Sequence, residues 1–177
     1  NQTDNTGAAG KIKPVFPTFK QAIPVGENTE AMITLAGLPE SEVRAGETFD
    51  VTVNINGAIA VRTYELHLGF DQSKLAVEDI VSNGNLFQYY LADMAGRLTD
   101  DGLGMANAIL GRRPVGASGE ATLATIRFRA ISRASETYLR LNDAMLIDVD
   151  FEEAKPKLDE GGMIVLSKDP IVYHDAN

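Results

Sequence analysis

The chain contains no cysteine and no tryptophan among its 177 residues. Without cysteine it can form no disulfide, no thiolate nucleophile and no cysteine-ligated metal site. It also lacks any apolar run near the 18 or so residues that a membrane-spanning helix requires. Aromatic residues make up only 7% of the sequence, so we expect a core filled mainly by aliphatic side chains.

Basic residues are also scarce. Lysine and arginine together number 16, against 25 aspartates and glutamates, which gives a formal net charge of −9. A chain of this charge repels phosphate backbones, and it carries no basic stripe with interleaved aromatic residues. The densest basic spot, Arg112-Arg113, precedes Pro114 and fits a solvated loop. Nucleic-acid binding is therefore not expected.

Catalytic motifs are missing as well. The two histidines are His67 and His174, and neither has a serine or a carboxylate at the spacing of a catalytic motif. Neither Gly-x-Ser-x-Gly nor His-Glu-x-x-His occurs. Carboxylates that a glycosidase would pair lie within residues 148–153. Their first two members alternate with Ile147, Val149 and Phe151, which is the pattern of a strand with a polar outer face. We predict that the chain is not an enzyme.

Acidic residues gather at two places, Asp100-Asp101-Gly102 and Asp148-x-Asp150-x-Glu152. Carboxylates of this kind are hard oxygen ligands that calcium accepts. The sequence lacks the spaced Asp-x-Asp-x-Asp-Gly loop that makes calcium binding specific, and acidic clusters also form solvated faces. The candidate ligands of a structural calcium ion are Asp100, Asp101, Asp148 and Asp150, and no other cofactor is expected.

The sequence is rich in alternation of apolar and polar residues, most clearly between residues 45 and 75. After the turn residues Ala45-Gly46-Glu47, the apolar members of a first run are Phe49, Val51, Val53 and Ile55. Those of a second run are Tyr64, Leu66, Leu68 and Phe70. A period of two places them on one face of a pleated strand. Asn56-Gly57 breaks the first run, which predicts two strands with a corner between them.

The second run stops at Asp71, in the turn formed by residues 71–74, and Leu75 points inward again. The carboxylate of Asp71 can accept backbone N–H bonds within this turn. We therefore expect Asp71→Ala to lower the stability of the protein.

Further strands are expected along most of the chain. Their ranges are 32–36, 48–55, 61–70, 75–82, 86–91, 105–110, 121–131, 138–141, 144–149 and 162–166, with a short helix as the alternative for 86–91. A hairpin tip is expected at 93–104, and Ile126, Phe128 and Ala130 are expected to face inward. Short strands at this spacing, without an amphipathic helix, are typical of a β-sandwich or barrel. The pattern therefore predicts an all-β fold, a β-sandwich or barrel of about nine strands, within residues 31–168.

The two ends of the chain differ from this pattern. Residues 1–10 are small and polar, and the chain begins with Asn1 rather than Met, as expected of a processed or truncated product. The apolar residues of the following stretch are Ile12, Val15, Phe16 and Phe19, interrupted by two prolines. Proline excludes a central strand and favours an extended segment. We therefore expect an N-terminal arm over residues 1–30, draped on its own domain or docked on a neighbour, and a C-terminal tail over 169–177.

Three segments in order resemble the cohesin-like modules. A glycine turn precedes an alternating strand at Ala45-Gly46-Glu47-Thr48-Phe49-Asp50-Val51. A strand then ends in an aromatic-Asp turn followed by leucine, from Leu66 to Leu75, and a Gly-x-x-x-Leu-Ala-x-Ile-x-Phe strand runs from Gly119 to Phe128. Gly161-Gly162-Met163-Ile164-Val165 is similar to the family's final strand.

The resemblance implies a nine-stranded jelly-roll sandwich without catalytic activity, used outside the cell or at its surface for protein attachment. In cellulosomes such modules hold dockerins, and similar modules occur in bacterial and archaeal surface proteins that have no cellulosome. The chain differs from the cellulosomal setting because it has no Thr/Pro-rich linker, and because its proline-bearing arm lies outside the module.

Three functions are compatible with these observations. In the first, a sheet face with the outward row Thr63, Glu65 and His67 holds another protein, as cohesins hold dockerins. In the second, the subunit forms a filament because its arm adds a strand to the sheet edge of a neighbouring copy. In the third, the jelly roll binds carbohydrate, although tryptophan is absent and the Tyr89-Tyr90 pair would point to opposite faces of a strand.

Overall fold

The computed structural model describes residues 28–82, 96–108 and 116–169. A single 3-10 turn, Asn28–Glu30, is the only helical element in this part, and no helix there is long and apolar enough to cross a membrane. The strands are β1 (Met32–Ala36), β2 (Thr48–Phe70), β3 (Leu75–Ser82), β4 (Arg97–Thr99), β5 (Gly102–Ala108), β6 (Ala117–Ala130), β7 (Glu136–Asp148), β8 (Glu153–Ala154), β9 (Lys157–Leu158) and β10 (Gly162–Val165).

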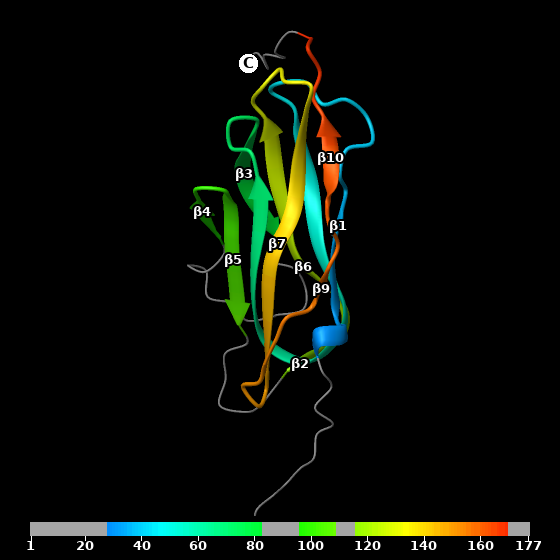
Figure 1. Ribbon diagram of the computed structural model, residues 1–177, viewed down its shortest axis with the longest axis vertical. Coiled ribbons are helices and arrows are strands. Elements are labelled where there is room, and N and C mark those ends of the chain that lie inside the picture. The colour runs from blue at the N-terminus through cyan, green and yellow to red at the C-terminus, as the bar shows by residue number, and fades with distance from the viewer. Residues whose placement is uncertain (1–27, 83–95, 109–115, 170–177) are drawn as a thin grey trace, which may run out of the picture.

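These strands form a β-sandwich whose two layers share β2 (Figure 1). The first half of β2 pairs with β1 and β6, and this layer runs in the order β9-β1-β2-β6-β3. The second half pairs with β5 and β7, and this layer runs in the order β4-β5-β2-β7-β10. Every pair except β1 with β9 is antiparallel. In Figure 1, β7 lies in front of β6, so the two layers face each other.

The corner of β2 lies where the sequence predicted it, but the prediction of two separate strands was wrong. The strand continues through Asn56-Gly57, and its pairing with β6 shifts register twice between Ile55 and Val61. Gly57 and Ala60 adopt left-handed φ values of 74° and 47°. Such bulges bend a strand, which lets β2 pass from one layer to the other.

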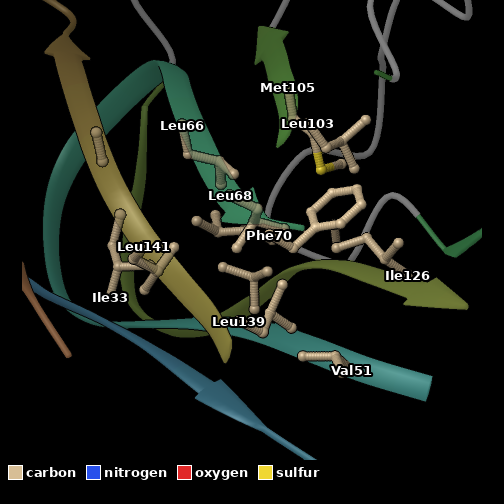
Figure 2. Close-up of a cluster of buried hydrophobic side chains, with 14 of the residues drawn as sticks. Ile33, Val51, Leu66, Leu68, Phe70, Leu103, Met105, Ile126, Leu139 and Leu141 are labelled. Atoms are coloured by element: carbon tan, nitrogen blue, oxygen red, sulfur yellow. The ribbon is translucent and has the colours of Figure 1, made fainter. Parts of the chain in front are cut away.

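The core lies between the two layers and is mainly aliphatic, as predicted. Both predicted runs face it, with Val51, Val53 and Ile55 from one half of β2 and Tyr64, Leu66 and Leu68 from the other. Figure 2 shows Leu66 and Leu68 beside Leu139 and Leu141 of β7 and Ile126 of β6. The rings of Phe70 and Phe128 meet edge to face at a centroid distance of 5.2 Å, which joins the two layers.

Two strand predictions need correction. β7 is one strand rather than two. Its pairing with β2 skips Asn142, so this residue forms a bulge between residues 141 and 143 and does not end the strand. The tip of the β4–β5 hairpin is Asp100-Asp101, so β5 begins at Gly102 and not at residue 105. β4 lies inside the segment 93–104 that was predicted as a hairpin tip, and β8 and β9 were not predicted as strands. The strand expected at 86–91 lies outside the described residues.

The end of β7 also differs from the predicted facing of its side chains at Asp148 and Phe151, although Val149 is buried as predicted. Asp148 is buried at 7% exposure, and one of its carboxylate oxygens accepts the N–H groups of Asp150 and Glu152 at 2.8 and 3.0 Å. Phe151 is instead 72% exposed, with a left-handed φ of 63°. The alternation ends at Asp148 because the chain turns there. The carboxylate of Asp148 points into this turn, where it accepts the backbone N–H groups.

The Asp71 turn agrees with its prediction. The carboxylate of Asp71 accepts the backbone N–H of Ser73 at 2.9 Å and the Ser73 hydroxyl at 2.6 Å. Its backbone carbonyl accepts the N–H groups of Lys74 and Leu75, both at 3.0 Å. These bonds reverse the chain between β2 and β3, and Leu75 is fully buried.

Candidate protein-binding face

The predicted row Thr63, Glu65 and His67 lies on the outer side of β2, in the centre of the β5–β2–β7 layer. Glu65 is exposed, while Thr63 and His67 are half-buried. The inward residues between them, Tyr64 and Leu66, belong to the core. The row is therefore held by the packing beneath it, as a binding surface on a rigid element requires.

On one side of this row, β5 presents only very small side chains. Gly104 lies opposite His67, Ala106 opposite Glu65 and Ala108 opposite Thr63. None of these residues rises above the sheet by more than a methyl group. The outer surface of β5 is therefore a low, smooth strip beside a taller polar row.

On the other side, a hollow of about 240 Å³ separates the row from β7. Its lining residues are Glu65, Leu66, His67, Asp143, Ala144, Met145 and Lys155. Lys155 donates to the carboxylate of Asp143 at 3.1 Å across its rim. The hollow thus has small or apolar residues at its base and charges of both signs around it.

A hydrogen-bond network holds the ring of His67 in place. Its Nε2 lies 2.9 Å from the Thr99 hydroxyl and 3.2 Å from the Asp101 carboxylate, and Thr99 donates to Asp101 at 3.0 Å. Its Nδ1 lies 3.4 Å from the amide nitrogen of Asn142. These contacts fit a ring with its proton on Nε2. Together they connect the β4–β5 tip to β2 and β7.

Asn142, the bulged residue of β7, lies over Gly69 of β2. A Cβ atom at Gly69 would collide with the side-chain amide of Asn142, so a larger residue at this position would displace that amide. The strands predicted at 138–141 and 144–149 leave Asn142 in a break between them, so its place on the face was not predicted. The bulge at Asn142 leaves only a weak signal in the sequence, because a bulge depends on the partner strand and not on local sequence.

The four aspartates named as calcium ligands lie in two separate places. The carbonyl of Asp101 accepts the N–H of Phe70, whereas Asp148 pairs with Val61 nine positions earlier on β2. At about 3.3 Å per residue, the two acidic pairs are roughly 30 Å apart. No group of three or more histidines or carboxylates in the described part of the chain could hold a metal ion. The two acidic pairs therefore cannot share one ion, and a calcium ion at either pair stays a prediction.

Other predicted site residues lie outside the described ranges. These are the arm residues Ile12, Val15, Phe16 and Phe19 and the Tyr89-Tyr90 pair. The arm-mediated filament and the tyrosine-based carbohydrate site stay predictions.

Comparison with known proteins assigns the family. A model of the cohesin domain matches residues 34–165, from β1 to the end of β10. The chain belongs to the cohesin family. The match confirms the resemblance drawn from the sequence, and it spans both layers of the sandwich as well as the shared strand β2. No curated protein matches this cohesin in sequence.

Solved cohesin structures share its fold. A non-cellulosomal cohesin from the hyperthermophilic archaeon Archaeoglobus fulgidus is 23% identical with a TM-score of 0.61, over 77% of this cohesin and 91% of that chain. A cohesin module from a family 33 glycoside hydrolase of Clostridium perfringens is 14% identical with a TM-score of 0.62, over 78% and 98%. A type II cohesin from a cohesin–X-dockerin complex of Acetivibrio cellulolyticus is 15% identical with a TM-score of 0.59, over 77% and 99%.

Membership in the family has two consequences. Cohesin modules are non-catalytic binding domains, so this cohesin is not an enzyme. They typically belong to extracellular or cell-surface scaffolds.

Proposed function

We propose that this cohesin attaches a dockerin-bearing protein through the outer face of β5, β2 and β7. The family supports a protein partner, and two similar solved structures are of cohesin–dockerin complexes. We also propose that it acts outside the cell or at its surface, where the modules of this family typically occur.

The observation that carries the proposal is the shape of this face. The smooth strip of Gly104, Ala106 and Ala108 lets a partner backbone approach the sheet closely. The taller row on β2 and the hollow beside it then supply polar contacts that fix the partner's orientation. A close-packed centre with a polar rim is the usual anatomy of a specific protein interface.

The test is a steric block placed on the strip. Ala106→Arg puts a long cation in its middle, while Ala36→Arg makes the same change at an exposed position of β1 in the other layer. We expect calorimetry against a panel of purified dockerins to find at least one that binds the wild type and the Ala36→Arg variant equally. The Ala106→Arg variant should lose at least tenfold in affinity. Equal binding by both variants would contradict the proposed face.

A filament remains a separate prediction, because it rests on arm residues outside the described ranges. Its test is deletion of residues 1–30, followed by light scattering at high concentration. Polymerisation by the truncated protein, or a monomeric intact protein, would rule the arm out.

A further inference from the structure

Tyr138 and Arg140 stand together on the outer side of β7, at the end of the proposed face nearest β10. The guanidinium carbon of Arg140 lies 4.8 Å from the centroid of the Tyr138 ring. Tyr138 is 42% exposed despite this contact. Within the described residues Arg140 forms no ion pair and no hydrogen bond through its guanidinium. Its planar set of N–H donors therefore faces solvent.

Exposed apolar residues continue this pair onto β10. Met163 lies directly opposite Tyr138 and is 47% exposed, and Val165, opposite Glu136, is 37% exposed. Tyrosine, methionine and arginine are enriched at protein interfaces, and tyrosine and arginine carry a large share of binding energy there. The composition of this patch thus differs from that of the polar row on β2.

Two hollows flank the pair, and glycines make room for both. One of about 460 Å³ lies toward β2 and the Asp71 turn, with Gly69 in its lining. The other, of about 490 Å³, lies toward β10 and is lined by Gly161 and Gly162. A side chain at Gly161 would collide with the Leu139 carbonyl, so this position must stay bare. Tyr138 and Arg140 therefore form a knob between two depressions.

We propose that Tyr138 and Arg140 are the anchor of the partner-binding face, and that the partner seats a carboxylate on Arg140 beside an apolar side chain on Tyr138 and Met163. An unpaired guanidinium binds a carboxylate through two parallel N–H bonds, which gives both affinity and direction. The inference rests on the proposed function, because the anchor lies on the same sheet face as the row on β2. Arg140 pairs with Gly69, which is the next outward position after His67 on β2. It adds the chemistry of the partner segment and the place where binding is strongest.

The experiment uses a dockerin that binds the wild-type protein, and it compares four single variants and one double variant of the anchor. We expect Arg140→Ala and Tyr138→Ala each to weaken binding by about tenfold or more, the size typical of central interface residues. Arg140→Lys should restore only part of the affinity because the planar fork is lost, and Tyr138→Phe should bind almost like the wild type. The loss in the Tyr138→Ala/Arg140→Ala double variant should be smaller than the product of the single losses, because the two side chains stack. The matched control is Arg129→Ala, at an exposed position of β6 in the other layer.

The outcomes separate this inference from the proposed function. If Ala106→Arg abolishes binding while Arg140→Ala and Tyr138→Ala leave it unchanged, the face is correct and the anchor is wrong. If Arg140→Ala abolishes binding while Ala106→Arg has no effect, the anchor holds and the strip on β5 is not part of the interface. Failure of every dockerin to bind overturns both. Thermal unfolding of each variant excludes loss of fold, and the conservative Arg140→Lys and Tyr138→Phe variants keep the test valid if an alanine variant unfolds.

Discussion

Asn28 holds both backbone hydrogen-bonding groups of Ile59, 31 positions later in the chain. Its amide nitrogen donates to the Ile59 carbonyl at 2.9 Å, and its amide oxygen accepts the Ile59 N–H at 2.8 Å. Asn28 is buried at 2% exposure. The 3-10 turn that begins at Asn28 is thereby fixed to the corner where β2 changes layers.

Removal of this clamp should destabilise the protein. Asn28→Ala removes both hydrogen bonds to the backbone of Ile59, and each such bond contributes about 0.5 to 1.5 kcal/mol, so the expected loss is about 1 to 3 kcal/mol. Urea unfolding should show a decrease of that size in the free energy of unfolding. The control is Thr29→Ala, at the exposed next position, which should change stability by less than about 0.5 kcal/mol. Equal effects of the two substitutions would show that the clamp contributes nothing.

The edge-to-face pair of Phe70 and Phe128 predicts a large effect in the core. Phe128 is fully buried, and it also stacks on Phe49 at 5.8 Å. Phe128→Ala should cost about 3 to 5 kcal/mol, the range for a phenylalanine removed from a close-packed core. Phe49→Ala, at a half-buried position of β2, removes the same atoms and should cost clearly less. Chemical denaturation of both variants checks the order.

The left-handed backbone of Phe151 predicts a stabilising substitution. An L-residue in this conformation costs about 1 to 2 kcal/mol, and asparagine tolerates it better than a bulky aromatic residue. Part of the gain is lost with the contact between the Phe151 ring and Arg62, whose guanidinium carbon lies 5.4 Å from the ring centroid. We expect Phe151→Asn to raise stability by about 0.5 to 1 kcal/mol. Ile131→Asn, which also replaces an exposed apolar residue, has no left-handed backbone to relieve and should give no gain.

The paired charges on the outer face of the other layer predict a dependence on pH. Arg127 donates to both carboxylate oxygens of Asp50, at 2.7 and 2.9 Å, and these hydrogen bonds lower the pKa of Asp50 below its usual value. A lowered pKa in the folded state means that the stabilisation is complete above the unfolded value of about 3.9 and is lost as the pH falls below it. The urea midpoint should therefore drop between pH 5 and pH 3, and less steeply in Asp50→Asn. An unchanged slope in that variant would contradict the assignment.

The Asp71 turn offers a second acid-sensitive element. Hydrogen bonds from the Ser73 hydroxyl and backbone lower the pKa of Asp71, so protonation of this carboxylate also weakens the folded state below about pH 4. Asp71→Ala should lower the urea midpoint at neutral pH, since it removes both bonds. Ser73→Ala removes only the hydroxyl contact and should give a smaller decrease.

Most of the fold follows from local pattern. The alternation at residues 48–55 and 61–70 placed the inward side chains correctly, because the pleat of a strand imposes a period of two. The continuity of β2 did not follow from the sequence, because Asn56-Gly57 has the composition of a turn. It depends on β6 and Asn28, which lie far away in the sequence. The bulge at Asn142 was missed for the same reason.

Only part of the candidate face could be predicted from the sequence. Thr63, Glu65 and His67 were placed outward by the same alternation. The strip beside them could not be predicted, because Gly104 and Ala106 acquire their role only through their register with β2, about 40 positions earlier. Tyr138 and Arg140 share a face by alternation, but their exposure beside Met163 depends on the pairing of β7 with β10.

The passage of β2 through both layers governs how the domain opens. Disruption of either sheet removes the pairing partners of one half of β2, so it also weakens the layer that holds the other half. The amide protons at the centres of the two layers should therefore exchange with solvent in one cooperative event, with a common opening free energy close to that of global unfolding.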